Sequence, residues 1–324
     1  MKKIVFICPY FGKLPNTFDL WLKTCSENKT IDWLLFIDDK TQYKFPNNVK
    51  VSYISFSELK DKIKERYKNI NVKIETPYKL CDYKPLYGDI FSEYISEYDF
   101  WGYCDLDCIF GNLRKFFTEE LLNKYDRLLF LGHMSLYKNE KKINERYKIE
   151  WNGKNYKNML ENASNMAFDE NYNDISINTI YRDNNFKIYK ENIYADISCL
   201  SFYFRIVDNT KIKTKKEKKN SSQLFLWNNG NLYSKKIVKN KIITKEYCYV
   251  HFQKRKVLVK INDIENCKSF IFRPNEFIEG NIFSIEDIKR NKKRCFIYKQ
   301  YFILKYKNLK NRLGSLKEKT NEKI

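Results

Sequence analysis

The stretch Phe-Trp-Gly-Tyr-Cys-Asp-Leu-Asp at residues 100–107 is the most informative part of the chain. Its first five residues are apolar, which is typical of a buried strand, and two carboxylates follow directly. Alternation along a strand predicts that Asp105 and Asp107 point to the same side, with Leu106 opposed. Ligands bind at this end of the strands in an α/β sheet, and two carboxylates there suit one divalent cation. A pair of solvated or capping aspartates near a turn is the alternative.

The composition indicates a folded protein with enough apolar material for a core. The chain has 324 residues, of which 43% are hydrophobic and 17% aromatic. No stretch reaches the ~20 apolar residues that a membrane span needs. Nine cysteines without paired spacing favour a reducing compartment over a disulfide framework. We therefore expect a cytoplasmic protein.

The net charge of +21 is unevenly distributed along the chain. Residues 211–219 carry six lysines, and residues 284–324 interleave bases with aromatic side chains. On a helix this second pattern gives an aromatic and a cationic side, suited to peripheral binding at anionic lipid. A solvated helix is the alternative, and no nucleic-acid recognition motif occurs. We expect a main domain over residues 1–283 and a basic amphipathic tail over residues 284–324.

The N-terminal part predicts strands that alternate with helices. Residues 3–8 and the apolar run 33–37 predict strands, and residues 49–56 alternate into a third strand, while residues 18–25 and 58–67 predict helices. This order is typical of a nucleotide-binding α/β half. No Gly-x-Gly-x-x-Gly motif and no Walker-type loop is present, so neither a dinucleotide fold nor a P-loop NTPase is supported.

The segment 77–88 is predicted to lead into a helix, with Pro85 in its first turn. Asp82 and Lys84 would then lie at a helix N-terminus, where a lysine and backbone amides can meet a phosphate. A capping aspartate beside an exposed lysine is the alternative. Residues 128–137 predict a further buried strand.

Three later features complete the set of polar candidates. Asp169 and Glu170 precede a helical pattern at residues 175–181, where acidic residues can simply match the helix dipole. Residues 247–256 predict a strand that ends on His251 and then a basic cluster; a lone histidine on an apolar strand is usually a core residue. Residues 221–233 predict a hairpin with an Asn/Gly turn. We expect its Trp227, and the buried-strand histidine His133, to pack rather than to bind sugar.

Four blocks in this order resemble the GT-A glycosyltransferases of bacterial surface-polysaccharide loci. They are Pro-Tyr-Phe-Gly at residues 9–12, Asp-Asp at 38–39, Lys-Leu-Cys-Asp-Tyr-Lys-Pro at 79–85, and the block 101–113 around the two aspartates. The layout is similar to that of family 8 galactosyl- and glucosyltransferases. The resemblance runs from residue 1 to about residue 274 and implies an α/β, Rossmann-like GT-A fold with a mixed central sheet.

The resemblance also implies ligands and site residues. The donor would be a nucleotide-sugar, most often a UDP-sugar, and the acceptor a surface glycan or a lipid-linked glycan. Mn²⁺ or Mg²⁺ would be held by Asp105, Asp107 and His251, and Asp169 or Glu170 would contact the acceptor hydroxyl as the catalytic residue. The donor-binding residues would be Pro9, Tyr10, Phe11, Asp38, Asp39, Asp82, Lys84 and one or both of Lys254 and Lys256.

Other functions have weaker support. The Gly and Pro-Trp that accompany the histidine and lysine in family 8 are missing here, which leaves the choice of lysine open. A haloacid-dehalogenase-type phosphatase would carry its Asp-x-Asp motif in the first strand, and a sugar nucleotidyltransferase would open with a Gly-rich loop. The remaining alternative is a catalytically inactive GT-A-like protein that binds a membrane or another polyanion through its basic surface.

Overall fold

The chain forms two compact units, Met1–Tyr194 and Ala195–Ile324, in a computed structural model. The residues whose structure is described are 1–171, 173–199, 201, 203–208, 215–216, 223–253, 255–292, 302–303, 305–306 and 309–310. Lys254, most of the lysine-rich segment 211–219 and most of the predicted tail lie outside this set. Within the described part, no helix combines the length and the apolar character needed to cross a membrane.

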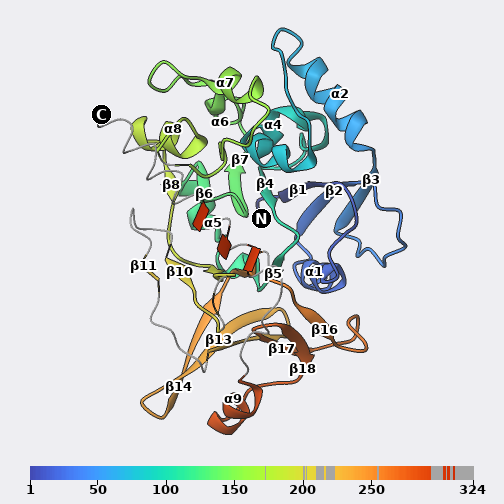
Figure 1. The fold of residues 1–324 in the computed structure, drawn as a ribbon, viewed down its shortest axis with the longest axis vertical. Coiled ribbons are helices and arrows are strands. Elements are labelled where there is room, and N and C mark those ends of the chain that lie inside the picture. The colour runs from blue at the N-terminus through green and yellow to red at the C-terminus, as the bar shows by residue number, and fades with distance from the viewer. Residues whose placement is uncertain are drawn as a thin grey trace. The chain divides into compact units, whose positions relative to one another are not determined.

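Unit 1 is built on a seven-stranded mixed sheet with the order β3-β2-β1-β4-β7-β6-β8 (Figure 1). Strands β3, β2, β1 and β4 are parallel, whereas β7 pairs antiparallel with both β4 and β6. This confirms the predicted α/β class with a mixed sheet. The strands of unit 1 are β1 Ile4–Tyr10, β2 Ile31–Ile37, β3 Val49–Tyr53, β4 Phe100–Cys104, β5 Cys108–Phe110, β6 Arg127–Leu131, β7 Met134–Lys138 and β8 Ile188–Tyr189.

Some helices of unit 1 begin where the sequence supplies a capping side chain. Ser55 and Glu58 form a capping box at the start of α2, and Ser176 caps α8 in the same way with Thr179. The helices are α1 Phe18–Ser26, α2 Phe56–Arg66, α5 Glu119–Lys124, α6 Lys141–Asn144, α7 Tyr156–Leu160 and α8 Ile177–Asp183, with the 3-10 turns η4 Leu113–Lys115 and η5 Arg146–Lys148.

The segment after residue 76 is not the single helix that the sequence predicted. A chain of short helical pieces replaces it, because Pro85 lacks an N–H and restricts the residue before it, which interrupts a continuous α-helix. Lys84 opens the second 3-10 piece instead of preceding a long helix. The pieces are η1 Pro77–Lys79, α3 Leu80–Tyr83, η2 Lys84–Leu86, α4 Tyr87–Ile90 and η3 Ser92–Tyr94.

Residues 128–137, predicted as one strand, form a hairpin instead. Strand β6 ends at Leu131 and β7 begins at Met134, so Gly132 and His133 make the turn. The pairing register shifts just before the turn, where Leu129 has a φ of 67°. A bulge of this kind bends a strand strongly. The prediction failed because both strands are buried and read as one apolar run.

The core of unit 1 lies between the sheet and its helices and is rich in aromatic rings. Trp101 of β4 stacks on Tyr137 of β7 with a ring separation of 4.7 Å. Trp21 of α1 meets Trp33 of β2 edge to face at 6.1 Å. All four rings are at most 2% exposed, so β4 is held rigidly up to Cys104.

Unit 2 contains a six-stranded sheet with the order β14-β13-β12-β17-β18-β16. The predicted hairpin is present, with Asn229 and Gly230 in left-handed conformations between β12 and β13. A separate parallel pair joins β9 to β15. The strands are β9 Ala195–Asp196, β10 Val207–Asp208, β11 Lys215–Lys216, β12 Leu224–Asn228, β13 Asn231–Val238, β14 Lys241–Tyr247, β15 Tyr249–His251, β16 Leu258–Lys260, β17 Ser269–Arg273 and β18 Glu276–Glu279.

The last described long helix, α9 Ile285–Asn291, packs on this sheet through Ile288, which is fully buried with Leu226 and Ile271. The first residues of the predicted tail therefore contribute to the core of unit 2. The extent of a main domain over residues 1–283 stays a prediction.

Candidate functional site

The carboxyl ends of four parallel strands share one edge of the sheet in unit 1. These ends are Tyr10, Ile37, Tyr53 and Cys104. The chain leaves β1 toward β2 and β3 on one side and later returns to β4 on the other. Such a reversal of strand order opens a crevice outside the strand ends, which is the usual ligand position in α/β sheets.

Asp105 and Asp107 lie at this reversal, immediately after β4. They sit in a turn between β4 and β5, so strand alternation does not orient them as predicted. The buried Leu106 anchors the turn, and the Asp105 amide donates to the His133 carbonyl at 3.0 Å. A carboxylate oxygen of Asp105 and one of Asp107 lie within 4.8 Å of each other. The two side chains can therefore share a ligand, as expected, although by turn geometry.

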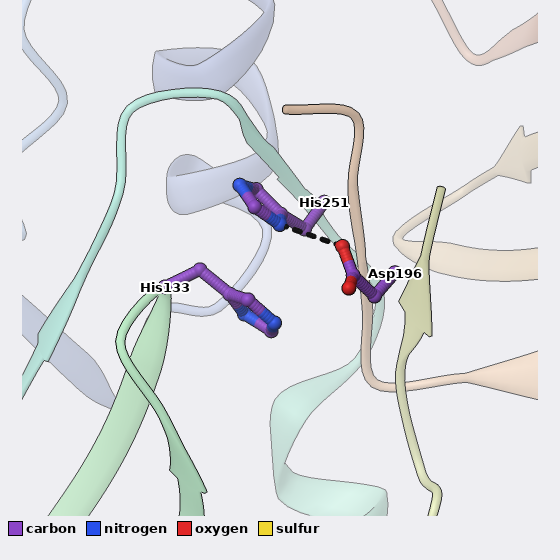
Figure 2. Close-up of side chains that lie close together, drawn as sticks. All are labelled: His133, Asp196 and His251. Atoms are coloured by element: carbon purple, nitrogen blue, oxygen red, sulfur yellow. Dashed lines mark hydrogen bonds and ion pairs between the residues drawn. The ribbon is translucent and has the colours of Figure 1, made fainter. Parts of the chain in front are cut away.

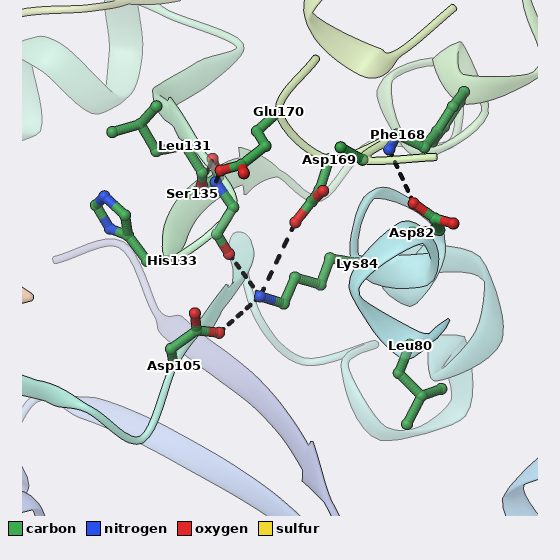
Figure 3. A network of polar contacts seen from close by, with 12 residues as sticks. Leu80, Asp82, Lys84, Asp105, Leu131, His133, Ser135, Phe168, Asp169 and Glu170 are labelled. Carbon is green, nitrogen blue, oxygen red and sulfur yellow. Dashed lines mark hydrogen bonds and ion pairs between the residues drawn. The ribbon is translucent and has the colours of Figure 1, made fainter. Parts of the chain in front are cut away.

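Lys84 binds Asp105 from inside the protein (Figure 3). Its ammonium group donates to Asp105 Oδ1 at 2.6 Å and to the Gly132 carbonyl at 2.7 Å, and Asp169 Oδ2 lies 4.0 Å away. Burial alone would lower the pKa of Lys84, but nearby charges, led by Asp105, raise it well above its ordinary value. Lys84 therefore stays charged and positions Asp105, rather than pointing from a helix end toward a phosphate.

Asp169 and Glu170 approach the same place from the segment before α8. They lie in a turn seven and six residues ahead of Ser176, the cap of that helix, so the helix dipole does not explain them. Asp169 is 4% exposed, and burial raises its pKa to about 8 despite the ammonium group of Lys84. Glu170 is exposed and accepts a hydrogen bond from the Gly132 amide at 3.2 Å.

Gly132 makes this convergence possible. A Cβ atom added there would lie 2.4 Å from Asp169 Oδ2 and 2.9 Å from Glu170 Oε2. The glycine thus leaves room for two carboxylates while its carbonyl binds Lys84. Sequence reasoning missed Gly132, although an isolated glycine inside a strand pattern suggests a bulge or a close backbone approach.

Asp82 does not join this group, although the sequence placed it with Lys84. Its carboxylate is fully buried and accepts from Lys79 Nζ at 2.7 Å and from the Met166 and Phe168 amides at 2.9 and 3.0 Å. These contacts hold the segment that leads to Asp169. These contacts indicate structural support, and the donor-binding role of Asp82 stays a prediction.

The loop after β1 is fixed by the two aspartates after β2. Asp38 accepts from the Gly12 amide at 2.7 Å, and Asp39 accepts from the Leu14 amide at 3.0 Å. Hydrogen bonds, first from Thr41 and then from Leu14, lower the pKa of Asp39.

The predicted donor-binding residues Pro9, Tyr10 and Phe11 lie at the end of β1 and directly after it. All three are half-buried. Burial and the charge of Asp107 raise the pKa of Tyr10, which indicates that Tyr10 lies near the aspartate pair.

His251 ends strand β15 of unit 2, as predicted. Its Nδ1 lies 2.9 Å from Asp196 Oδ1 on the neighbouring strand β9, as Figure 2 shows. Gln253 Nε2 donates to the same oxygen at 2.8 Å. Asp196 was not identified from the sequence, because it precedes its partner by 55 residues and lies in a strand of only two residues.

The basic residues that follow His251 differ in burial. Lys256 is exposed, whereas Arg255 is buried and donates to the carbonyls of Ser198, Ser201 and Pro274. Lys254 lies outside the described residues. Lys256 is therefore the described lysine of this cluster that solvent can reach.

The two side chains expected to pack do so. Trp227 is 1% exposed and stacks on Phe270 at 4.9 Å within unit 2. His133 is 5% exposed, and its ring meets Tyr194 edge to face at 5.5 Å within unit 1.

Two solved structures are similar to parts of the chain. Mouse xyloside xylosyltransferase 1 in its apo form matches with 8% identity and a TM-score of 0.36, over 61% of this chain and 88% of that one. The galactosyltransferase LgtC in complex with donor and acceptor sugar analogs matches with 12% identity and a TM-score of 0.34, over 60% and 75%. Neither score is high enough to transfer a fold or an activity to this chain.

Sequence comparison gives a broader match. No curated protein is significantly similar to the chain. A family profile, however, covers residues 6–281, which include every candidate residue described above. The chain belongs to the family of unknown function DUF6625.

Proposed function

We propose that the chain is a metal-dependent glycosyltransferase, which moves a sugar from a nucleotide-sugar, of the UDP type, to a surface glycan or a lipid-linked acceptor. The observation that carries the proposal is the Asp105–Asp107 turn at the reversal of strand order beside β1. A negatively charged diphosphate does not bind two carboxylates directly, so a bridging cation is required.

The donor set suits a hard divalent cation. Two carboxylates within 4.8 Å match the oxygen ligands that Mn²⁺ and Mg²⁺ prefer, and an imidazole is an acceptable further ligand for Mn²⁺. We propose Asp105 and Asp107 as ligands, with His251 of unit 2 as the third. When bound, the ion would supply positive charge that neutralises the leaving diphosphate.

The other residues would bind and orient the donor. Lys84 keeps Asp105 in one position through its hydrogen bonds to Asp105 and Gly132. The loop of Pro9, Tyr10 and Phe11, held by Asp38 and Asp39, is our proposed nucleoside-binding element. Lys256, with Lys254, would contact the diphosphate and stabilise its developing charge.

Asp169 and Glu170 are proposed to face the acceptor. A carboxylate that accepts a proton from the acceptor hydroxyl must be reachable by the acceptor. Glu170 is exposed, whereas Asp169 is buried with a raised pKa and is suited to holding a proton. We therefore assign contact with the hydroxyl to Glu170 and a supporting role to Asp169.

Calorimetry with Mn²⁺ and a panel of nucleoside diphosphate sugars tests the proposal. The wild type should bind one donor only when Mn²⁺ is present, and Asp105→Ala/Asp107→Ala should abolish this binding. Glu93→Ala/Glu97→Ala removes two exposed carboxylates of the same unit and is the matched control. The absence of donor binding under any metal would overturn the proposal.

The net charge of +21 favours a second candidate, an inactive protein that binds a polyanionic surface. The same charge supports a peripheral location at the inner face of the cytoplasmic membrane. A truncation after Lys292 keeps α9, whose Ile288 is buried, and should reduce sedimentation with vesicles of anionic phospholipid. Vesicle binding by the full chain, together with no donor binding in the calorimetry, would favour the second candidate.

A further inference from the structure

Asp196 and His251 form a side-chain hydrogen bond between adjacent strands of unit 2. They are register partners in the parallel pairing of β9 with β15, so the backbone fixes their separation. The neighbouring Ile197 amide donates to the His251 carbonyl at 2.9 Å and closes the ladder. The side chains of His251 and Asp196 are 12% and 9% exposed, which places their contact of 2.9 Å largely out of water.

The Asp196 carboxylate, which accepts the hydrogen bond, determines which nitrogen of His251 carries the proton. An ionised carboxylate has no hydrogen to donate, so Nδ1 must donate to Asp196 Oδ1. Gln253 also donates to this oxygen, through Nε2 at 2.8 Å. Two donors on one oxygen fit an ionised aspartate. A neutral His251 with its proton on Nδ1 carries its lone pair on Nε2.

We propose that Asp196 is a positioning residue that holds His251 as the Nδ1–H tautomer, so that Nε2 is the nitrogen whose lone pair would bind a metal ion. The metal part of this inference rests on the proposed function, whereas the tautomer is a property of the metal-free chain. Carboxylates that accept from a ligating histidine orient its ring and increase its basicity, and their loss typically weakens metal binding by about 10–100-fold.

Nitrogen-15 NMR of the imidazole rings tests the tautomer directly. The chain has only two histidines, so a His251→Gln variant identifies the signals of His251. The spectra are recorded about two pH units above the ordinary imidazole pKa of about 6.5, where the ring is neutral. The wild type should show the Nδ1–H form. Asp196→Leu, which is similar in size and lacks an acceptor, should lose it.

Calorimetry with Mn²⁺ alone tests the consequence. Asp196→Leu should weaken Mn²⁺ binding by about 10–100-fold. Asp196→Asn keeps an acceptor oxygen but loses the charge, so it should keep the tautomer and lose less Mn²⁺ affinity than Asp196→Leu. If the leucine variant does not fold, the asparagine variant replaces it in the comparison. Glu276→Gln changes another buried, ion-paired carboxylate of unit 2, next to Arg273 and Lys260, and is the matched control.

The outcomes separate the two proposals. An Nε2–H tautomer in the wild type, or an unchanged tautomer in Asp196→Leu, overturns the positioning role. Mn²⁺ binding that is equal in the wild type and in Asp196→Leu overturns the inference and leaves the proposed function standing. The expected tautomer together with no Mn²⁺ binding by the wild type overturns the metal part of the inference, whereas the proposed function is decided by the donor titrations described above.

Discussion

Two lysines of unit 1 that are five residues apart, Lys79 and Lys84, each pair with an aspartate, but in different surroundings. In the pair Lys79–Asp82 the side chains are 1% and 0% exposed, and in the pair Lys84–Asp105 they are 10% and 35% exposed. The Asp82 carboxylate is also bonded to the Met166 and Phe168 amides. Asp105 keeps a third of its side chain open to solvent at the sheet edge.

This difference shows that identical residue types can lie in an enclosed environment or in one that solvent reaches. A carboxylate enclosed by donors has no capacity for an additional ligand. Its removal should therefore change mainly the free energy of unfolding. A carboxylate held on one side by a buried lysine and open on the other is oriented but still able to bind. Local sequence does not distinguish the two pairs, because the distinction depends on the segment around residue 168 that encloses Asp82.

The largest expected effect is at the enclosed pair. Asp82→Ala leaves the buried Lys79 uncompensated and two amides without an acceptor, so the free energy of unfolding should fall by about 3–5 kcal/mol. Urea denaturation measures this change. Asp105→Ala is the comparison and should cost about 2 kcal/mol or less, because the Asp105 side chain is 35% exposed whereas that of Asp82 is fully buried. Equal losses in the two variants would contradict the division into structural and ligand-binding pairs.

A smaller effect is expected at the glycine between the carboxylates. The Cβ of Gly132→Ala would lie 2.4 Å from Asp169 Oδ2, so the side chains must shift, at a cost of about 1–3 kcal/mol. Denaturation of Gly132→Ala, of Asp169→Ala and of the double variant measures the coupling between the two positions. The double variant should be more stable than the sum of the single changes predicts, since the clash has lost its partner. Additive losses would show that Gly132 is needed for another reason.

Much of the fold was predictable because it follows from local pattern. The apolar runs that became β1, β2 and β4 are continuous, and Asn229-Gly230 has the sequence of a tight turn. The Asp105–Asp107 motif was found because it directly follows such a run. Strand alternation failed there only because the residues lie in a turn.

The remaining parts depend on contacts between distant segments. The turn at Gly132 is hidden because both of its strands are buried and apolar. The burial of Asp169 is set by elements more than 35 residues away, including Lys84 and Gly132. The partnership of Asp196 with His251 arises from a parallel pairing of very short strands. Periodicity carries no information about any of these three contacts.

A further, smaller effect concerns pH. The pKa of Asp169 is raised in the folded state from its ordinary 3.8 to about 8, so the folded chain binds more protons than the unfolded chain between these values. This carboxyl therefore reduces stability as the pH rises from about 4 to about 8. Asp169→Asn cannot ionise at this position and should therefore lack this fall in stability between pH 5 and pH 8. Thermal unfolding at pH 5 and pH 8 measures the change in stability of both proteins. An equal change in the wild type and in Asp169→Asn would contradict the raised pKa.

The smallest change in stability is expected at Glu170, the exposed neighbour of Asp169. Glu170→Gln keeps an oxygen that can accept from the Gly132 amide, so its free energy of unfolding should change by no more than about 0.5 kcal/mol. If Glu170 contacts the acceptor hydroxyl as proposed, the same variant should reduce the transfer rate by about 10²-fold or more. A large loss of stability would instead group Glu170 with Asp82, as a carboxylate whose work is structural, and would leave Asp169 as the candidate for contact with the acceptor.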